Sequence, residues 1–113
     1  MAKSEARGRA TLEDGFRRAE AAPRRFATLF THGTLEVEFY APRGTDPQTP
    51  HARDEAYVVA RGSGWFRCGP ARDRVAAGDF LFVPAGMEHR FEEFSDDFGV
   101  WVFFYGPEGG ETP

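Results

Sequence analysis

The sequence predicts an all-β protein, a β-sandwich or barrel of antiparallel strands with one short helical segment near the N-terminus. From residue 26 onward, apolar and polar residues alternate with a period of two, which is typical of strands that bury one face. Turn residues recur roughly every 8–12 positions, the spacing found in sandwiches and barrels. Aromatic residues make up 15% of the 113 residues and include 12 phenylalanines, a composition that favours sheet.

The alternation is clearest in TLEVEFYA, residues 34–41, where Leu35, Val37 and Phe39 share one face. The sequence predicts about seven or eight strands in total. The other predicted strand segments are EAYVVARG, SGWFRCG, PARDRVAAG, DFLFVPAG, HRFEEF and VWVFFYG. The link RGSG, residues 61–64, predicts a hairpin turn between two of them.

The first residues differ from the strand-rich part. Residues 1–10 are small or charged without apolar periodicity, so we expect them to be disordered. A short helix is predicted next, because Thr11 can cap its N-terminus and Pro23 ends the pattern. One domain is therefore expected over residues 11–106, followed by a mobile tail at 107–113.

Composition excludes several classes of protein. The net charge is −4, and the arginine-rich N-terminal segment is interspersed with acidic residues, which argues against nucleic acid as a partner. No apolar run approaches about 18 residues, so no membrane span is expected. Cys68 is the single cysteine and cannot form an intrachain disulfide. The sequence also shows no secretory leader, and we expect a cytoplasmic protein.

Two segments combine a histidine with turn residues at regular spacing. Residues 78–93 have the form G-x5-P-x-G-x2-H-x3-E, with Gly78, Pro84, Gly86, His89 and Glu93. Residues 44–62 end in H-x3-E-x6-G, with His51, Glu55 and Gly62. These segments resemble the two motifs of the cupin family, and the resemblance covers residues 34–105. It implies a small jelly-roll barrel, also called a double-stranded β-helix.

The first motif departs from the family pattern, which places His-x-His before the glutamate. His51 occupies the second histidine position and Thr49 the first, and the spacing from Gly44 is one residue short. A neutral hydroxyl is a poor metal ligand. Thr49 and Gln48 are the two residues expected at the fourth ligand position, which is otherwise open to water, to substrate or to Asp46.

The resemblance implies a metal site formed by His51, Glu55 and His89. Two imidazoles and one carboxylate leave coordination positions open, as in non-haem iron oxygenases. The expected cofactor is one divalent metal ion, Fe, Mn, Ni or Zn. Strand alternation places further side chains on the same faces or on neighbouring strands, and we expect the pocket to be lined by Tyr57, Phe91, Glu93, Phe39 and Trp101.

Simpler interpretations stand beside this one. His89 could be an ordinary histidine at a strand start, and His51 could form a rim ion pair with Glu55. Asp54 is an alternative carboxylate, although the spacing to the next glycine favours its neighbour. His32 precedes a strand at a turn and is expected on the surface.

The sequence favours a small metal-binding cupin, an enzyme with dioxygenase-like or isomerase-like chemistry on a small oxygen-bearing molecule. One alternative is a non-catalytic binding or sensing module. The other is a metal-free epimerase-like enzyme, in which His51 or His89 is the base and Tyr57 a possible acid. A homodimer is the expected assembly, since the last strand is strongly apolar and barrel edges need cover.

Overall fold

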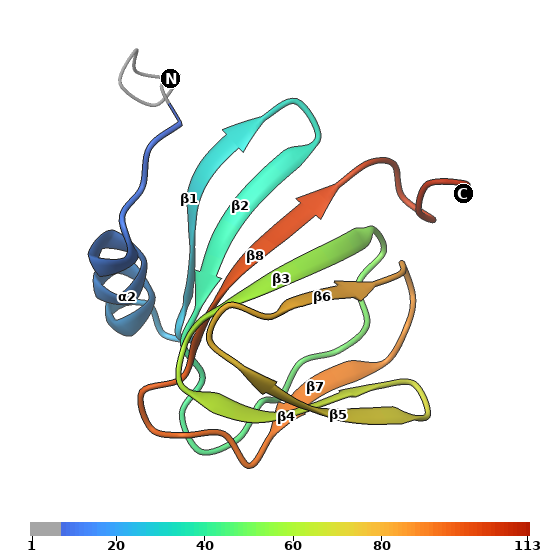
Figure 1. Ribbon diagram of the computed structural model, residues 1–113. Helices are drawn as coiled ribbons and strands as arrows, with labels where there is room; N and C mark the ends of the chain where they lie inside the picture. The colour runs from blue at the N-terminus through green and yellow to red at the C-terminus, as the bar shows by residue number, and fades with distance from the viewer. Residues whose placement is uncertain (1–7) are drawn as a thin grey trace.

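The computed structural model describes residues 8–113, which form one helix and eight strands (Figure 1). The elements are α2 (Leu12–Ala21), β1 (Phe26–His32), β2 (Leu35–Tyr40), β3 (Asp54–Arg61), β4 (Ser63–Cys68), β5 (Ala71–Ala76), β6 (Phe80–Val83), β7 (His89–Glu92) and β8 (Gly99–Tyr105). Within the described part of the chain, no helix has the length and apolar character needed to cross a membrane. Most of the segment expected to be disordered, residues 1–7 of 1–10, lies outside the described residues.

The strands form two antiparallel sheets that face each other (Figure 1). The large sheet has the order β1-β2-β8-β3-β6, and the small sheet has the order β5-β4-β7. The chain crosses between the two sheets four times, from β3 to β4, from β5 to β6, from β6 to β7 and from β7 to β8, as in a jelly-roll. The predicted all-β class is confirmed.

The link at residues 61–64 is not a hairpin, contrary to the prediction. Strands β3 and β4 belong to different sheets, and the chain passes from one sheet to the other at Gly62, whose φ is +81°. A side chain there would also collide with Ser95, since an added Cβ lies 2.4 Å from its Oγ. The hairpin lies one strand later, where β4 pairs with β5 around Gly69.

Aromatic side chains fill the space between the two sheets. Tyr57 of β3 meets Phe91 of β7 edge-on with ring centroids 5.0 Å apart, and Phe98 meets the other side of Phe91 at 4.9 Å. Each ring is 1% exposed or less, and burying such a side chain contributes about 1.5–3 kcal/mol. This packing confirms that Tyr57 and Phe91 point inward from their strands.

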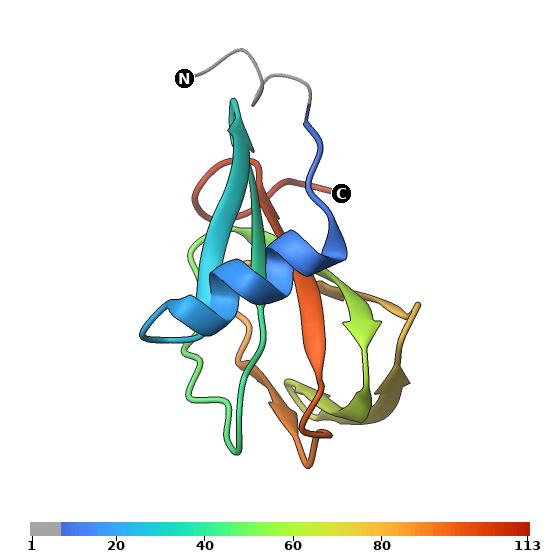
Figure 2. The same cartoon turned by 90° about the vertical axis from the view of Figure 1, so that its left-hand side faces the viewer.

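Helix α2 packs on the outer face of the large sheet (Figures 1 and 2). Thr11 caps its N-terminus as predicted, in a capping box in which the side chains of Thr11 and Asp14 each accept a hydrogen bond from the other's backbone N–H. Its apolar side covers Phe39, which is fully buried and lies 4.7 Å from the ring of Phe16 and 4.9 Å from that of Trp101.

Phe39 and Trp101 therefore do not line the barrel interior, and this expectation is wrong. Strand alternation sends Phe39 outward, so the inner face of β2 presents the intervening residues Glu38 and Tyr40 instead. An apolar side chain on this strand is buried by the helix and not by the barrel.

Hydrogen bonds join the C-terminal residues to the start of β3. Gly109 donates its backbone N–H to the carbonyl of Ala52 at 2.7 Å. The buried carboxylate of Asp54 accepts from the backbone N–H groups of Glu111 and Ala85 at 2.8 and 2.9 Å. The sequence did not predict these contacts in the segment 107–113, and they give Asp54 a structural role away from the histidines.

Replacing Gly15 with alanine should destabilise the protein, although alanine is the better helix former by about 1 kcal/mol. An added Cβ would lie 2.6 Å from the ring of Phe39, which is fully enclosed and cannot move away. We expect Gly15→Ala to lower the free energy of unfolding by about 1–3 kcal/mol in urea denaturation. The exposed helical change Glu20→Ala is the control and should be close to neutral. A Gly15→Ala protein as stable as the wild type would contradict the described packing.

Glu92 should stabilise the fold by an amount that depends on pH. Arg72 donates to its carboxylate at 2.7 Å, with Arg67 and Arg90 at 3.3 and 2.9 Å. These guanidinium groups, Arg72 foremost, lower the pKa of Glu92 from 4.5 to about 2. The stabilising contribution is therefore present above pH 4.5 and is lost as the pH falls toward 2. In urea titrations, Glu92→Gln should be less stable than wild type at pH 7, with the difference shrinking between pH 4.5 and 2. A difference that stays constant over this range would rule out the carboxylate's charge as its source.

Candidate metal centre

The two histidine-containing segments meet through their backbones. Strand β6 ends at Val83, and the chain then turns at Gly86, whose φ of +80° favours glycine. The N–H of Gly86 donates to the carbonyl of His51 at 2.7 Å. The turn therefore fixes the loop of His51 beside the start of β7, where His89 begins its strand.

Glu55 and His89 approach each other from opposite sheets. Glu55 lies on β3 of the large sheet and His89 on β7 of the small sheet. Both point into the barrel and are 1% and 2% exposed. The Oε1 atom of Glu55 lies 3.0 Å from the Nε2 atom of His89, although neither atom has a partner with hydrogen-bond geometry.

The protonation of His89 is set by its other ring nitrogen. Nδ1 lies 2.9 Å from the carbonyl oxygen of Met87, which can only accept a hydrogen bond, so Nδ1 carries a proton. In the neutral ring, Nε2 then presents its lone pair toward the lone pairs of Glu55. Burial lowers the pKa of His89, but the contacts with Glu55 and Met87 outweigh it and raise the pKa overall. Two buried acceptors this close require a cation between them, either a proton or a metal ion.

His51 completes a cluster at the barrel mouth. Its Nε2 atom lies 3.8 Å from Oε1 of Glu55, and its ring packs edge-on against Phe104 with centroids 4.9 Å apart. The side chain keeps 35% exposure, so the cluster opens toward solvent on this side. Burial lowers the pKa of His51, which favours the neutral ring that metals bind. One ligand atom from each of His51, Glu55 and His89 lies within 4.8 Å of the other two.

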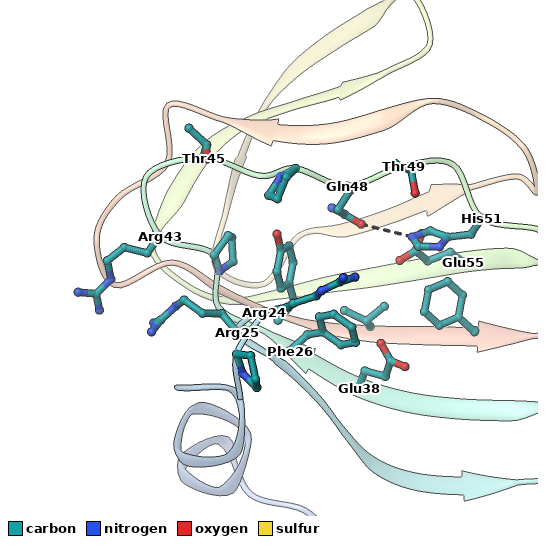
Figure 3. A pocket seen from close by; sticks show the side chains of 16 residues that line it. Arg24, Arg25, Phe26, Glu38, Arg43, Thr45, Gln48, Thr49, His51 and Glu55 are labelled. Carbon is teal, nitrogen blue, oxygen red and sulfur yellow. Dashed lines mark hydrogen bonds and ion pairs between the residues drawn. The ribbon is translucent and has the colours of Figure 1, made fainter. Parts of the chain in front are cut away.

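Gln48 directs its side-chain oxygen toward the same cluster (Figure 3). Its Oε1 atom accepts a hydrogen bond from the hydroxyl of Tyr57 at 2.9 Å and lies 3.5 Å from Nε2 of His51. Burial and the charge of Glu55 raise the pKa of Tyr57 well above its ordinary value, so its hydroxyl keeps the proton that it donates. Thr49 is exposed and lines the cleft beside it. Of the two residues expected at the open fourth position, Gln48 is the one held by hydrogen bonds.

The orientation of Gln48 depends on Asp46, which is 6% exposed. One carboxylate oxygen accepts from the Tyr40 hydroxyl at 2.6 Å, and the other accepts from the Gln48 amide at 2.7 Å and the backbone N–H of Phe91 at 2.8 Å. Burial and this carboxylate raise the pKa of Tyr40. Sequence reasoning offered Asp46 only as a ligand and missed this positioning role, because no local pattern marks a contact with a backbone group on β7.

A cleft of about 780 Å³ leads away from the cluster (Figure 3). Its walls come from residues 23–26, from the loop 42–51, and from the inner faces of β2, β3 and β8. His51 and Glu55 lie at one end, Arg43 lies at the opposite end, and Arg24 lies in the middle. The cleft gives a small molecule access to the exposed side of His51.

The expected lining residues lie mostly elsewhere. Tyr57 and Phe91 belong to the buried core, and only the hydroxyl of Tyr57 reaches toward the cluster. Glu93 does not line the pocket, contrary to expectation. Strand β7 ends at Glu92, and Glu93 takes a φ of +48°, so its side chain is 76% exposed and pairs with Arg72 at 2.9 Å. His32 is exposed as expected.

Comparison with known proteins agrees with this architecture. A family model described as "Cupin domain" matches residues 36–105. The matched part contains both histidine segments, nearly all of β2, and every strand from β3 to β8. The chain belongs to the cupin family. A curated relative, an uncharacterized protein of Streptomyces coelicolor, is 44% identical over 64 residues. That alignment covers 57% of this cupin and 61% of the relative, so this cupin spans less than two thirds of the relative's length.

Solved structures show the same fold at low sequence identity. A cupin 2 conserved barrel domain protein from Rhodopseudomonas palustris is 22% identical, with a TM-score of 0.61 over 74% of this cupin and 61% of that chain. The cupin domain of Cnp3 from Schizosaccharomyces pombe is 14% identical, with a TM-score of 0.64 over 73% and 60%. A proposed mannose-6-phosphate isomerase from Ralstonia eutropha is 26% identical, with a TM-score of 0.58 over 77% and 89%.

Asp46→Asn should destabilise this cupin and release Gln48. The amide would turn an N–H group toward donors that now bond a carboxylate, and hydrogen bonds to a charged group contribute about 1.5–3 kcal/mol. We expect the free energy of unfolding in urea to fall by about 2 kcal/mol or more. Asp73→Asn, at an exposed position of β5, removes the same charge and should be close to neutral. Equal stabilities for the two variants would contradict the role assigned to Asp46.

Proposed function

We propose that this cupin is a metal-dependent enzyme that binds one divalent ion at His51, Glu55 and His89. The observation behind the proposal is the pair of buried acceptors, Oε1 of Glu55 and Nε2 of His89, which face each other at 3.0 Å without hydrogen-bond partners. A bound cation would satisfy both atoms, and the neutral ring of His51 would be its third ligand. The donor set suits Fe, Mn, Ni or Zn, since imidazole and carboxylate bind these metals.

A metal ion in this position would supply Lewis acidity or oxygen activation to a small oxygen-bearing molecule in the cleft. The chain's own residues would prepare the site. Met87 fixes the ring of His89 through Nδ1, a contact that orients metal-binding histidines in general. Tyr57 and Asp46 hold the Gln48 oxygen toward the open side, where it can accept a hydrogen bond from the bound molecule or act as a fourth ligand.

Two reaction classes suit such a site, dioxygenase-like and isomerase-like. Three protein ligands leave positions open for oxygen and substrate together, which supports the first class. The likeness to the proposed mannose-6-phosphate isomerase of Ralstonia eutropha supports the second. Both classes require a small molecule next to the exposed face of His51, where the cleft ends. The expected homodimer and cytoplasmic location stay predictions.

A second candidate is metal-free acid–base catalysis. The same 3.0 Å contact could hold a proton between Glu55 and His89 in place of a metal ion. The raised pKa of His89 favours this arrangement. His51, whose side chain is 35% exposed and lines the cleft, would then act on a substrate proton as the general acid or base. This candidate and the metal-dependent one differ in what the cluster binds.

Elemental analysis of tag-free protein should distinguish the two. We expect near-stoichiometric metal in the wild type after loading, and metal affinity reduced by more than about tenfold in His51→Ala, Glu55→Gln and His89→Ala. His32→Ala is the matched control, because it removes an exposed histidine outside the cluster and should retain the metal. Oxygen uptake by the loaded protein would then separate the two reaction classes.

A wild type that cannot be loaded with Fe, Mn, Ni or Zn would overturn the metal-dependent proposal and leave the acid–base candidate. Circular dichroism of each variant shows whether a loss of metal reflects unfolding. Glu55→Gln keeps the shape of the buried side chain, so a folded Glu55→Gln protein without metal would point to the carboxylate itself.

A further inference from the structure

Positive charge gathers in the cleft beyond the histidine cluster. Arg24 and Arg25 follow helix α2, and Arg43 lies on the loop after β2. All three line the cleft together with Phe26. In Figure 3, Arg24 lies in the middle of the cleft and Arg43 at the end opposite His51 and Glu55. Two segments that are distant in sequence thus bring cationic side chains to one cavity.

Within the described residues, these arginines form no salt bridge with a carboxylate. Within residues 8–113, Arg24 and Arg43 form no ion pair, whereas Arg17, Arg53, Arg67, Arg72 and Arg90 each pair with an acidic side chain. Arg25 donates a hydrogen bond from its Nε atom to the carbonyl oxygen of Ala41 at 2.6 Å. A guanidinium without a partner in a cleft is suited to bind an anion from outside.

The backbone fixes where this segment enters the cleft. Arg25 has a φ of +62°, a left-handed conformation that is uncommon for residues other than glycine. Backbone hydrogen bonds hold it on both sides, from its N–H to Ala22 at 3.1 Å and from the N–H of Ala41 to its carbonyl at 2.9 Å. Arg24 is therefore presented from a defined turn and not from a free terminus.

We infer that the cleft binds a small anion, a carboxylate or a phosphate ester with an apolar body, whose charged group pairs with Arg24. This inference deepens the proposed function, on which it rests, by naming the substrate class. Phe26, Val102 and Phe104 supply apolar wall in the same cleft, and the ring of Phe104 packs against that of His51. A molecule oriented by Arg24 would direct its far end toward the histidine cluster.

Glu38 supplies the opposing charge and makes the inference testable in both directions. Its side chain also lines the cleft, where it accepts a long hydrogen bond from the Thr28 hydroxyl at 3.4 Å. A carboxylate in this position repels a bound anion. Removing the charge of Glu38 should therefore tighten anion binding, whereas removing that of Arg24 should weaken it.

The test uses benzoate, phenyl phosphate and the neutral amide benzamide as probes, titrated calorimetrically into metal-free protein prepared on a chelating resin. We expect at least one of the anions to bind about tenfold tighter than benzamide. The stronger anion identifies the source of the charge as carboxylate or phosphate. Its affinity should fall as salt is added, because Arg24 and Arg43 are exposed.

The variants separate the cleft from general electrostatics. Arg24→Gln should remove the preference of about tenfold for the anion. Arg17→Gln makes the same charge change at an exposed position of helix α2 that does not line the cleft, and should leave the preference intact. Glu38→Gln should raise the affinity for the anion and leave the affinity for benzamide unchanged. All three positions are at least partly exposed, and urea denaturation confirms that each variant folds.

Equal binding of benzamide and both anions, or an anion preference that survives in Arg24→Gln, would overturn the inference. Metal loading is measured separately on the same protein without probes. If metal binds but no anion preference exists, the substrate class is wrong and the proposed function stands. If the anion preference exists but no metal binds, the cleft binds anions as inferred and the metal-dependent function is wrong.

Discussion

A single buried carboxylate holds together the parts of this barrel from which the site is built. Asp46 lies in the long loop between β2 and β3, and its two oxygens reach Tyr40 on one sheet and the backbone of Phe91 on the other. Removing a carboxylate from water costs free energy unless both of its oxygens accept hydrogen bonds. Both oxygens of Asp46 do so. These hydrogen bonds fix the loop against both sheets, and a further one from the Gln48 amide to Asp46 fixes the orientation of Gln48.

The histidine cluster follows from a different constraint, the meeting of two sheets. Glu55 and His89 are brought together because β3 and β7 face each other across the barrel, although they never pair as strands. The core around Tyr57 and Phe91 keeps the sheets apart at a fixed distance. An exposed contact of the same spacing would be weak and screened, whereas these two acceptor atoms are buried and need a cation between them.

The sequence predicted the strands better than the faces. Alternation locates a strand because side chains point to opposite sides, but it does not say which side is interior. On β2 the apolar face with Phe39 lies under a helix, and the polar face with Glu38 lines the cleft, a reversal that depends on tertiary packing. Glu93 escaped prediction because its strand ends one residue earlier, where the backbone turns left-handed.

The ligand candidates were predictable for the opposite reason. His51, Glu55 and His89 lie at fixed spacings from glycines and a proline, and those turn residues determine the backbone path that brings the three side chains together. Asp46 has no comparable local signal, because its partner on β7 is 45 positions away in the sequence. Spacing identifies what a turn positions, but it says nothing of what a loop contacts across the barrel.

The part of the chain shared with the family begins at residue 36, after helix α2 and β1. Yet residues 23–26, which precede this shared part, form one wall of the cleft. The family model thus covers the part of the chain that carries both histidine segments, whereas one wall of the cleft comes from residues before the matched part. A substitution at Arg24 would therefore alter the wall of the cleft without touching β3 or β7, the strands that carry Glu55 and His89.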